Sequence, residues 1–340
     1  MVQTPAAATL GFEVDRVRTF DTPEFAGMTF LEVEAKSALN KVTGMPFPYS
    51  INPYRGCSHA CSYCFARPTH AYLNLSPLGD FESTVVVKTN LVEVLRRELA
   101  KPSWKGQHVA MGTNTDPYQR CEGRYRLMPG VIDALAAART PFSILTKGTL
   151  ITRDIDRLVA AAQLVPVAAA LTVGMLDDAL WRSSEPGTPS PRRRLDAVAA
   201  LNAAGIPTGV MLAPIMPDLN DDPAQLDALV DAAAQAHATH ITPIVLHLRP
   251  GVKEVFWDWL ERERPDLEPR YRVLYRSSQA AATYRDAVLQ HVRVRRAAAW
   301  KRHGRPPAQP TWRATVVTAD PTWPADPTRS EGRGEQLSLL

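Results

Sequence analysis

Cysteine is scarce in this sequence, and it is not distributed as a disulfide framework would be. The 340 residues contain four cysteines, and three of them, Cys57, Cys61 and Cys64, fall within eight residues. So low a density excludes a small secreted fold held together by disulfides. The tight spacing is more typical of reduced thiols that form a metal site.

Long apolar runs and targeting signals are also missing. The most apolar stretch, from Leu158 to Val173, is interrupted by Gln163 and Pro166 and is shorter than the roughly 18 residues of a membrane span. The N-terminal segment MVQTPAAATLGFEVDRV has no basic start followed by an apolar core. We therefore predict a cytoplasmic protein with no membrane partner.

A large net charge is absent too, but the basic residues are unevenly distributed. The formal net charge is +4, whereas residues 267–305 hold ten basic residues against Glu268 and Asp286. These are Arg270, Arg272, Arg276, Arg285, Arg293, Arg295, Arg296, Lys301, Arg302 and Arg305. The local excess favours a polyanionic partner such as DNA, bound through its phosphates. A solvated surface helix is the alternative interpretation.

What the sequence does contain, from about residue 51 to 248, is a regular alternation of β-branched runs and Ala/Leu-rich helical segments. We predict strands at 51–56, 108–113, 142–146, 168–174, 208–213 and 241–246, and helices at 91–99, 130–138, 154–162, 191–204 and 223–236. The alternation predicts an α/β fold, a partial (β/α)6 TIM-like barrel with a parallel sheet. Functional groups of such a fold gather at the carboxyl ends of the strands.

Composition also predicts how the chain is divided. We expect an N-terminal extension at 1–48, the partial barrel at 49–250, a basic helical extension at 251–303 and a disordered tail at 304–340. The tail is rich in Pro, Thr and charged residues, a composition that does not build a packed core.

The cysteine motif follows the first predicted strand, in the segment INPYRGCSHACSYCFARPTH. A loop this short can place three thiolates around one face of an iron-sulfur cubane and leave the fourth iron open to a small molecule. The alternative is tetrahedral zinc completed by His59, His70 or Cys121. Zinc modules usually divide their ligands into two separated pairs, so the spacing favours a 4Fe-4S cluster on Cys57, Cys61 and Cys64.

With Tyr63 directly before the third cysteine, the motif resembles the signature of the radical S-adenosylmethionine (SAM) superfamily. The segments MGTNTDPYQRCE, LTKG, the pair Glu185-Pro186 and APIMPDLND follow in an order that resembles the spore photoproduct lyase-like branch, often called DNA repair photolyases. This resemblance implies a 4Fe-4S cluster that cleaves SAM to a 5′-deoxyadenosyl radical, with flavodoxin or ferredoxin as electron donor.

The same resemblance implies repair or modification of nucleic acid as the function. Two alternatives stay open: radical chemistry on another substrate, and a non-catalytic nucleic-acid-binding protein stabilised by a metal. The cofactor-binding residues that we predict are Tyr63, Gly112, Thr113, Asn114, Asp116, Lys147 and Thr172.

Several of these residues follow predicted strands. The stretch that contains Asp116 occupies the place where the superfamily contacts the amino group of SAM, although GTNTD does not match the usual glycine-rich acidic motif. A proline-containing turn is the alternative there. Lys147, after the third strand, is suited to bind a carboxylate or phosphate, or it is a surface charge.

Two features lie outside these motifs. Cys121 is a candidate for a catalytic hydrogen-atom donor, because spore photoproduct lyase uses a cysteine in that way, or it is simply a small buried apolar residue. The last five residues are Gln336, Leu337, Ser338, Leu339 and Leu340. They resemble the peptide by which bacterial repair proteins dock on the DNA sliding clamp, although that peptide generally ends Leu-Phe. A terminus without a partner is the alternative.

Overall fold

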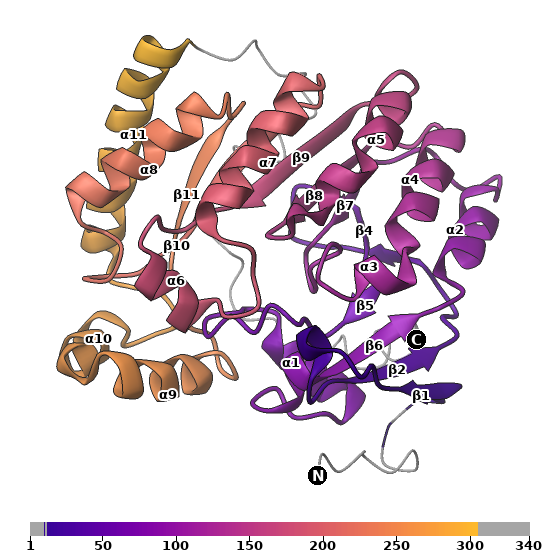
Figure 1. Cartoon of the computed structure of the whole chain (residues 1–340), viewed down its shortest axis with the longest axis horizontal. Helices are drawn as coiled ribbons and strands as arrows, with labels where there is room; N and C mark the ends of the chain where they lie inside the picture. Colours follow the sequence, from indigo (N-terminus) through magenta and orange to yellow (C-terminus); the bar gives the residue numbers. More distant parts are fainter. Residues whose placement is uncertain (1–9, 11, 305–340) are drawn as a thin grey trace.

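The computed structural model describes Leu10 and residues 12–304 (Figure 1). Apart from Gly304, the predicted tail therefore lies outside the described residues, as does the clamp-like peptide Gln336–Leu340. Among the described residues, no helix is both long enough and apolar enough to span a membrane.

A seven-stranded sheet forms the centre of the molecule, with the order β11-β10-β9-β8-β7-β4-β3. Six strands run parallel to their neighbours: β4 (Tyr49–Ile51), β7 (Val109–Met111), β8 (Phe142–Thr146), β9 (Val167–Thr172), β10 (Thr208–Ile215) and β11 (Ile241–Val245). β3 (Leu39–Lys41) pairs antiparallel with β4 at one edge. In the described part of the chain no ladder joins β3 to β11, so the sheet is open, which confirms the predicted partial barrel.

Helices cover the outside of this sheet (Figure 1). They are α2 (Leu91–Leu99), α4 (Leu127–Ala137), α5 (Ile155–Ala162), α7 (Pro191–Ala203) and α8 (Pro223–Gln235). The helix predicted at 154–162 is preceded by the 3₁₀ segment η4 (Thr149–Asp154). The Ser190 side chain accepts a hydrogen bond from the Arg193 N–H at the start of α7, and Asp222 caps α8 in the same way. These caps satisfy backbone donors that the first helical turn leaves free.

A second sheet, which the sequence interpretation missed, lies below the first in Figure 1. Its order is β1-β2-β6-β5, from β1 (Arg16–Arg18), β2 (Thr29–Val33), β6 (Thr84–Lys88) and β5 (Tyr54–Arg55). The strand predicted at 51–56 is therefore wrong as one element. It divides at Pro53, which lacks the N–H that would continue a ladder.

The small sheet takes two strands from before residue 48 and two from after it. The predicted extension at 1–48 thus shares a hydrogen-bonded sheet with the segment that carries the cysteines. The division of the chain into domains stays a prediction.

The chain ends its described part in helices, as expected. These are α9 (Lys253–Glu263), α10 (Glu268–Leu274) and α11 (Ala282–His303), and α11 lies against α8 through ion pairs of Asp227 with His291 and Arg295. The remaining elements are η2 (Pro23–Phe25), η3 (Arg67–Leu73), α1 (Asp80–Ser83), α3 (Glu122–Tyr125), α6 (Asp178–Ser184) and η5 (Pro265–Leu267).

Candidate active site

The three clustered cysteines lie on one loop that starts directly after β5. Cys57 and Cys61 are buried, Cys64 is half-buried, and all three are free thiols. The Cys57 N–H donates to the carbonyl of Phe81 (2.9 Å), and the Cys64 N–H donates to the carbonyl of Cys61 (3.2 Å). Hydrogen bonds of the polypeptide itself therefore fix the course of the loop.

The three thiols are close enough to influence one another. Burial raises the pKa of Cys57 well above its ordinary value, and the charges of Asp116, Cys64 and Cys61 raise it further. Burial raises the pKa of Cys61 to about 12, against the opposite effect of the Lys147 ammonium group. Lys147 is thus a cation close to the thiols, as is Arg194, and a bound metal would have to offset the cost of ionising them.

The loop that follows β7 braces the cysteine loop from one side. Gln119 accepts a hydrogen bond from the Ser58 N–H (2.8 Å) and donates to the carbonyl of Gly56 (3.1 Å). The Thr115 hydroxyl donates to the same carbonyl (2.7 Å). Gln119 is completely buried, and its role is invisible in the sequence, because nothing local marks a glutamine as a brace.

Asp116 joins three segments at this point. Its carboxylate accepts hydrogen bonds from the Thr146 hydroxyl (2.5 Å) and from the backbone N–H groups of Lys147 (2.7 Å) and Tyr118 (2.8 Å), and it lies 3.3 Å from His59 Nδ1. Burial alone would raise the pKa of Asp116, but His59 and Thr146 hold it below its ordinary value. The carboxylate is occupied by protein donors, so Asp116 connects β8 to the cysteine loop. Its predicted contact with SAM stays a prediction.

The segment that follows α6 braces the cysteine loop from the other side. The Ser62 N–H donates to the carbonyl of Ser184 (2.9 Å), and the Gly187 N–H donates to the carbonyl of His59 (3.1 Å). A Cβ atom on Gly187 would lie only 2.0 Å from the carbonyl oxygen of Ser58. Only glycine permits so close an approach of two backbones.

Within that segment, Glu185 is the centre of a buried network. Its carboxylate accepts hydrogen bonds from the Tyr63 hydroxyl, from the Arg194 guanidinium group and from the Thr188 hydroxyl (3.2 Å). The Lys147 ammonium group lies 5.5 Å from the centroid of the Tyr63 ring. Although burial opposes ionisation, Arg194 and Lys147 hold the pKa of Glu185 below its ordinary value. Glu185 thereby fixes the Tyr63 ring beside Lys147.

Arg194, which the sequence interpretation missed, completes this network. Its guanidinium group also donates to the carbonyls of Thr172 (2.8 Å) and Pro189 (2.9 Å), and its side chain is completely buried. In the sequence it is one of three consecutive arginines at the start of a helix, where a solvated position is the natural expectation. The predicted residue Thr172 reaches the network through its backbone carbonyl.

The other predicted residues follow β7. Gly112 has a φ of +90°, and a Cβ atom there would lie 1.9 Å from the carbonyl oxygen of Leu145. The Thr113 hydroxyl and the Asn114 N–H both approach the Asn52 side-chain oxygen, at 3.4 and 3.3 Å. Asn52 is buried, directly after β4, and the sequence interpretation missed it. The structure thus gathers Tyr63, Lys147 and Asp116 at the cysteine loop and places Thr113 and Asn114 against the end of β4.

Cys121 lies elsewhere, in a separate apolar cluster. It packs with Phe30, Tyr54, Val85 and Val87 behind the small sheet and is completely buried. Burial raises the pKa of Cys121 well above its ordinary value, so the thiol stays protonated. The predicted role as a hydrogen-atom donor stays a prediction.

The described residues offer no ready-made cage for a single metal ion, since no three His, Cys, Asp or Glu side chains converge in that way. His70, an alternative zinc ligand, instead has its Nε2 atom 3.0 Å from the carbonyl oxygen of Thr84. A cubane does not require three side chains to converge on one ion, because each cysteine binds a different iron. The buried hydroxyls of Ser58 and Ser62, in the same loop, have no hydrogen-bond partner in the described structure. Cluster sulfides are acceptors that fit them.

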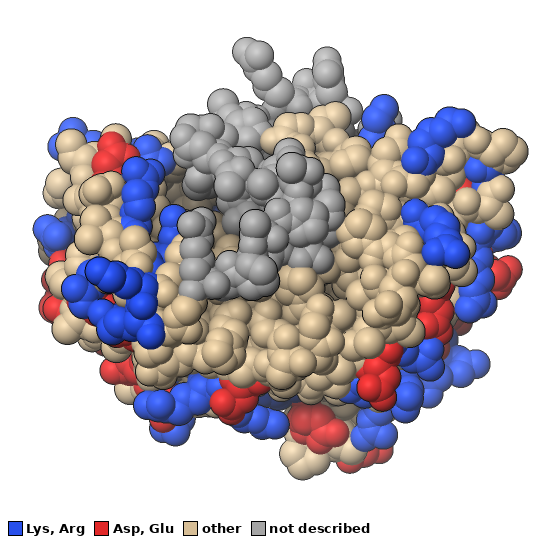
Figure 2. Space-filling model, turned by 90° about the horizontal axis from the view of Figure 1, so that it is seen from above, with Lys and Arg blue, Asp and Glu red and all other residues tan. Residues whose placement is uncertain are grey.

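The basic C-terminal stretch is partly neutralised by carboxylates of the protein itself. Arg270, Arg272, Arg295 and Arg302 form ion pairs with Asp218, Glu268, Asp227 and Asp231 respectively. On the face shown in Figure 2, Lys and Arg side chains are dispersed around the edge with acidic side chains among them. These observations weaken the charge argument for DNA binding.

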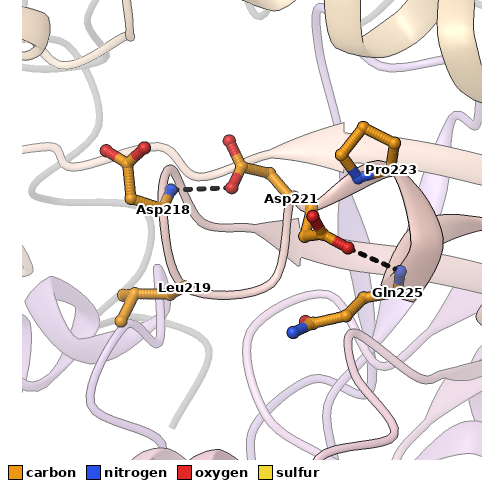
Figure 3. Close-up of a pocket in the computed structure, with 6 residues that line it drawn as sticks. Asp218, Leu219, Asp221, Pro223 and Gln225 are labelled. Atoms are coloured by element: carbon orange, nitrogen blue, oxygen red, sulfur yellow. Dashed lines mark hydrogen bonds between the residues drawn. The ribbon is translucent and has the colours of Figure 1, made fainter.

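The motif APIMPDLND comprises the end of β10 and the turn that follows it, beside an open hollow lined by Asp218, Asp221 and Asp222 (Figure 3). Asp221 accepts a hydrogen bond from the Asp218 N–H (2.7 Å), and Asp222 accepts one from the Gln225 N–H (3.2 Å). The Tyr284 hydroxyl donates to Asp221 (2.6 Å). These carboxylates are therefore engaged in turn and cap contacts.

Comparison with known proteins identifies the class to which this fold and loop belong. Residues 51–230 match the model of the radical SAM superfamily. Because this segment is more than half of the 340 residues, the chain belongs to the radical SAM superfamily, and it is a radical SAM enzyme.

More particular likenesses agree with this assignment. An uncharacterized protein of Mycobacterium tuberculosis is 52% identical over 280 residues, 81% of this chain and 82% of its own length. One of Methanocaldococcus jannaschii is 31% identical over 191 residues, 56% of this chain and 69% of its own length. Spore photoproduct lyase complexed with dinucleoside spore photoproduct matches with a TM-score of 0.62 and 15% identity, over 86% of this chain and 85% of that one. The chain therefore has the fold of spore photoproduct lyase.

Proposed function

We propose that Cys57, Cys61 and Cys64 hold a 4Fe-4S cluster with which this enzyme cleaves SAM to a 5′-deoxyadenosyl radical. The observation that carries the proposal is the convergence of the three thiols, Lys147 and the Tyr63–Glu185 contact at one loop inside the matched segment. When bound, the cluster supplies the electron for the cleavage. The protein supplies the residues that hold the cluster and line its surroundings.

The charge of Lys147 suits it to hold a carboxylate such as that of SAM. Burial opposes protonation, but the negative charges of Cys61 and Glu185 raise the pKa of Lys147 above its ordinary value. The ammonium group therefore remains charged at neutral pH and is held in place beside the Tyr63 ring. A charge that is positioned before the ligand arrives costs little reorganisation when the ligand binds.

The test is anaerobic reconstitution of the full chain followed by reduction in the presence of SAM. We expect about four irons per chain, an electron paramagnetic resonance signal that changes when SAM is added, and release of 5′-deoxyadenosine. Binding of zinc without SAM cleavage would contradict the proposal.

For the substrate, we propose a nucleic acid that carries a modified or damaged base. Two observations support this. A spore photoproduct lyase structure of the same fold is complexed with dinucleoside spore photoproduct. In addition, Arg276, Arg293 and Lys301 have no ion-pair partner within residues 12–304. Radical chemistry on another substrate is the second candidate, favoured by the ion pairs that occupy four other arginines.

Isotope transfer separates these two candidates. Deuterated DNA that passes its label to 5′-deoxyadenosine would support the nucleic acid, and binding to duplex should weaken steeply as salt rises. Absence of label transfer, together with salt-independent binding, would favour the other substrate class.

The proposal includes two protein partners in the cytoplasm. One is an electron donor such as flavodoxin or ferredoxin. The other is a sliding clamp bound through Gln336, Leu337, Ser338, Leu339 and Leu340. The test compares capture of the clamp by the full chain with capture by a variant that combines Leu337→Ala and Leu339→Ala. This variant should lose the clamp and keep SAM cleavage unchanged, and equal capture by both proteins would contradict the clamp contact.

A further inference from the structure

One face of the small sheet carries two buried basic side chains among apolar ones. Arg55 of β5 lies opposite Val86 of β6, and Lys88 lies two residues further along β6, so strand alternation places all three on one face. Leu31 and Val33 are the partners of Val86 and Lys88 on β2, and both belong to an apolar cluster. Arg55 is 2% exposed and Lys88 is 0% exposed.

The guanidinium group of Arg55 has no counter-ion in the described part of the chain. Its Nε and Nη1 atoms are buried and lack a hydrogen-bond partner. Burial lowers the pKa of Arg55, and Tyr72 is the one group whose charge acts in the opposite direction. Arginine nevertheless stays charged in proteins, so the small sheet encloses a positive charge that no described carboxylate neutralises.

The neighbours of Arg55 respond to this charge. Burial and then the charge of Arg55 lower the pKa of Lys88 to about 7. Burial lowers the pKa of His70 to about 4, and Arg55 contributes to that shift. The charges of Asp80 and Glu98 oppose these shifts at His70 and Lys88, whereas neither carboxylate acts on Arg55.

We propose that Arg55, with Lys88 and Tyr72 beside it, binds a small oxyanion, either phosphate or a carboxylate. A trapped water molecule would accept from the guanidinium nitrogens but would leave the buried charge unpaired, which is the costly condition. An oxyanion satisfies both the donors and the charge. The ligand is small because the donor atoms are buried, which keeps the phosphates of a polymer out of reach.

This site adjoins the cysteine loop without being part of it. Gly56 follows Arg55 directly, and its carbonyl is the acceptor that Thr115 and Gln119 share. A bound anion would therefore hold the strand from which the cysteine loop begins. The inference is independent of the cluster, because the site is formed by the polypeptide alone.

The experiment is calorimetric titration of the full-length protein, first without iron and then reconstituted, in chloride buffer at constant ionic strength. Inorganic phosphate is the probe in one arm and malonate in the other, so that the arm that saturates identifies the kind of anion. We expect saturation at one anion per chain, and at least tenfold weaker binding in Arg55→Gln. Arg97→Gln, which removes an exposed arginine of α2, is the matched control and should bind as the wild type does.

Wild-type protein that binds neither probe would overturn the proposal, and so would an Arg55→Gln variant with unchanged affinity. If Arg55→Gln does not fold, Arg55→Lys replaces it, since it keeps the charge and loses the planar donors. Binding in Arg55→Lys should be weaker than in the wild type, and unchanged binding would count against the site. Success in the iron-free arm together with failure of reconstitution would contradict the proposed function and leave this inference standing.

Discussion

The two sides of the cysteine loop treat a buried arginine in opposite ways. On the side of the main sheet, Arg194 is enclosed by Glu185, Thr188 and two backbone carbonyls. On the side of the small sheet, Arg55 is equally buried and has no hydrogen bond from its Nε and Nη1 atoms within the described structure. A buried charge that the protein itself pairs, as at Arg194, positions other side chains. A buried charge without a partner, as at Arg55, is a candidate site for a ligand.

The cysteines divide along the same line. Cys57, Cys61 and Cys64 share a loop beside the charged groups of Asp116, Lys147 and Glu185, and Cys121 lies in an apolar cluster with side chains of the small sheet. Substitutions on the two sides of the loop test this division.

Substitution of the cysteines should separate the two sides completely. Cys57→Ala, Cys61→Ala or Cys64→Ala should abolish iron binding and 5′-deoxyadenosine release, because two thiolates hold the cluster poorly. Cys121→Ala is the matched control and should retain both, since a buried thiol there serves packing. Iron analysis and product chromatography provide the measurements. A Cys121→Ala variant that keeps iron and 5′-deoxyadenosine release but changes the substrate-derived product would instead support the hydrogen-donor role.

Removal of each arginine should have opposite consequences for stability. Arg194→Met removes the ion-pair partner of the buried Glu185 carboxylate, so we expect a loss of about 3–5 kcal/mol in the free energy of unfolding. Arg55→Met removes an unpaired charge and should cost far less in a buffer without phosphate. Urea denaturation of the iron-free proteins measures both. Equal destabilisation by the two substitutions would remove the distinction between them.

The Glu185 carboxylate should make stability depend on pH. Its pKa in the folded protein is lower than the ordinary value of 4.5. Its contribution to stability is therefore complete above that value and is lost as the pH falls through the folded-state pKa. Unfolding free energies of wild type and Glu185→Gln, measured from about pH 3 to 7, should converge toward acid. Parallel curves would mean that Glu185 is not ionised in the folded protein.

The smallest expected effect concerns the unpaired hydroxyls of the cysteine loop. If Ser58 and Ser62 donate to cluster sulfides, Ser58→Ala and Ser62→Ala should each lower the reduction potential of the cluster, because hydrogen bonds to sulfur favour the reduced state. Ser183→Ala, outside the loop, is the control. A potentiometric titration monitored by electron paramagnetic resonance measures the shift. Unchanged potentials would mean that neither hydroxyl donates to the cluster.

Much of the barrel can be predicted because its signals are local. The helix predicted at 91–99 has the observed bounds of α2, and the Ser190-Pro191 start of α7 rests on a cap visible in the sequence. The small sheet was missed because β1 and β5 have only three and two residues, and because β2 pairs with β6, which lies far along the chain. The run TVVVK of β6 carries a strand signal, but it does not show which partners it takes.

The candidate site divides similarly. The spacing of Cys57, Cys61 and Cys64 identifies the loop, since three residues so close in the chain must lie close in space. Gln119 and Asn52 have no such signal, because the partners named above lie 61 to 63 positions away. Arg194 lies only nine positions from Glu185, but nothing in three consecutive arginines shows which of them turns inward. The Tyr63–Glu185 contact, for example, joins residues 122 positions apart.

The sequence by itself thus determined the cysteine loop, the alternation of strands and helices in the barrel and the family that they indicate, since each depends on spacing within a short segment. Only the tertiary structure decided which buried charges have a partner. Arg55 and Arg194 both stand at the boundary of a strand or helix, and nothing around them in the chain distinguishes them. The fold places the Glu185 carboxylate beside Arg194 and apolar strands around Arg55. This difference matters because burying a charge without a partner costs free energy.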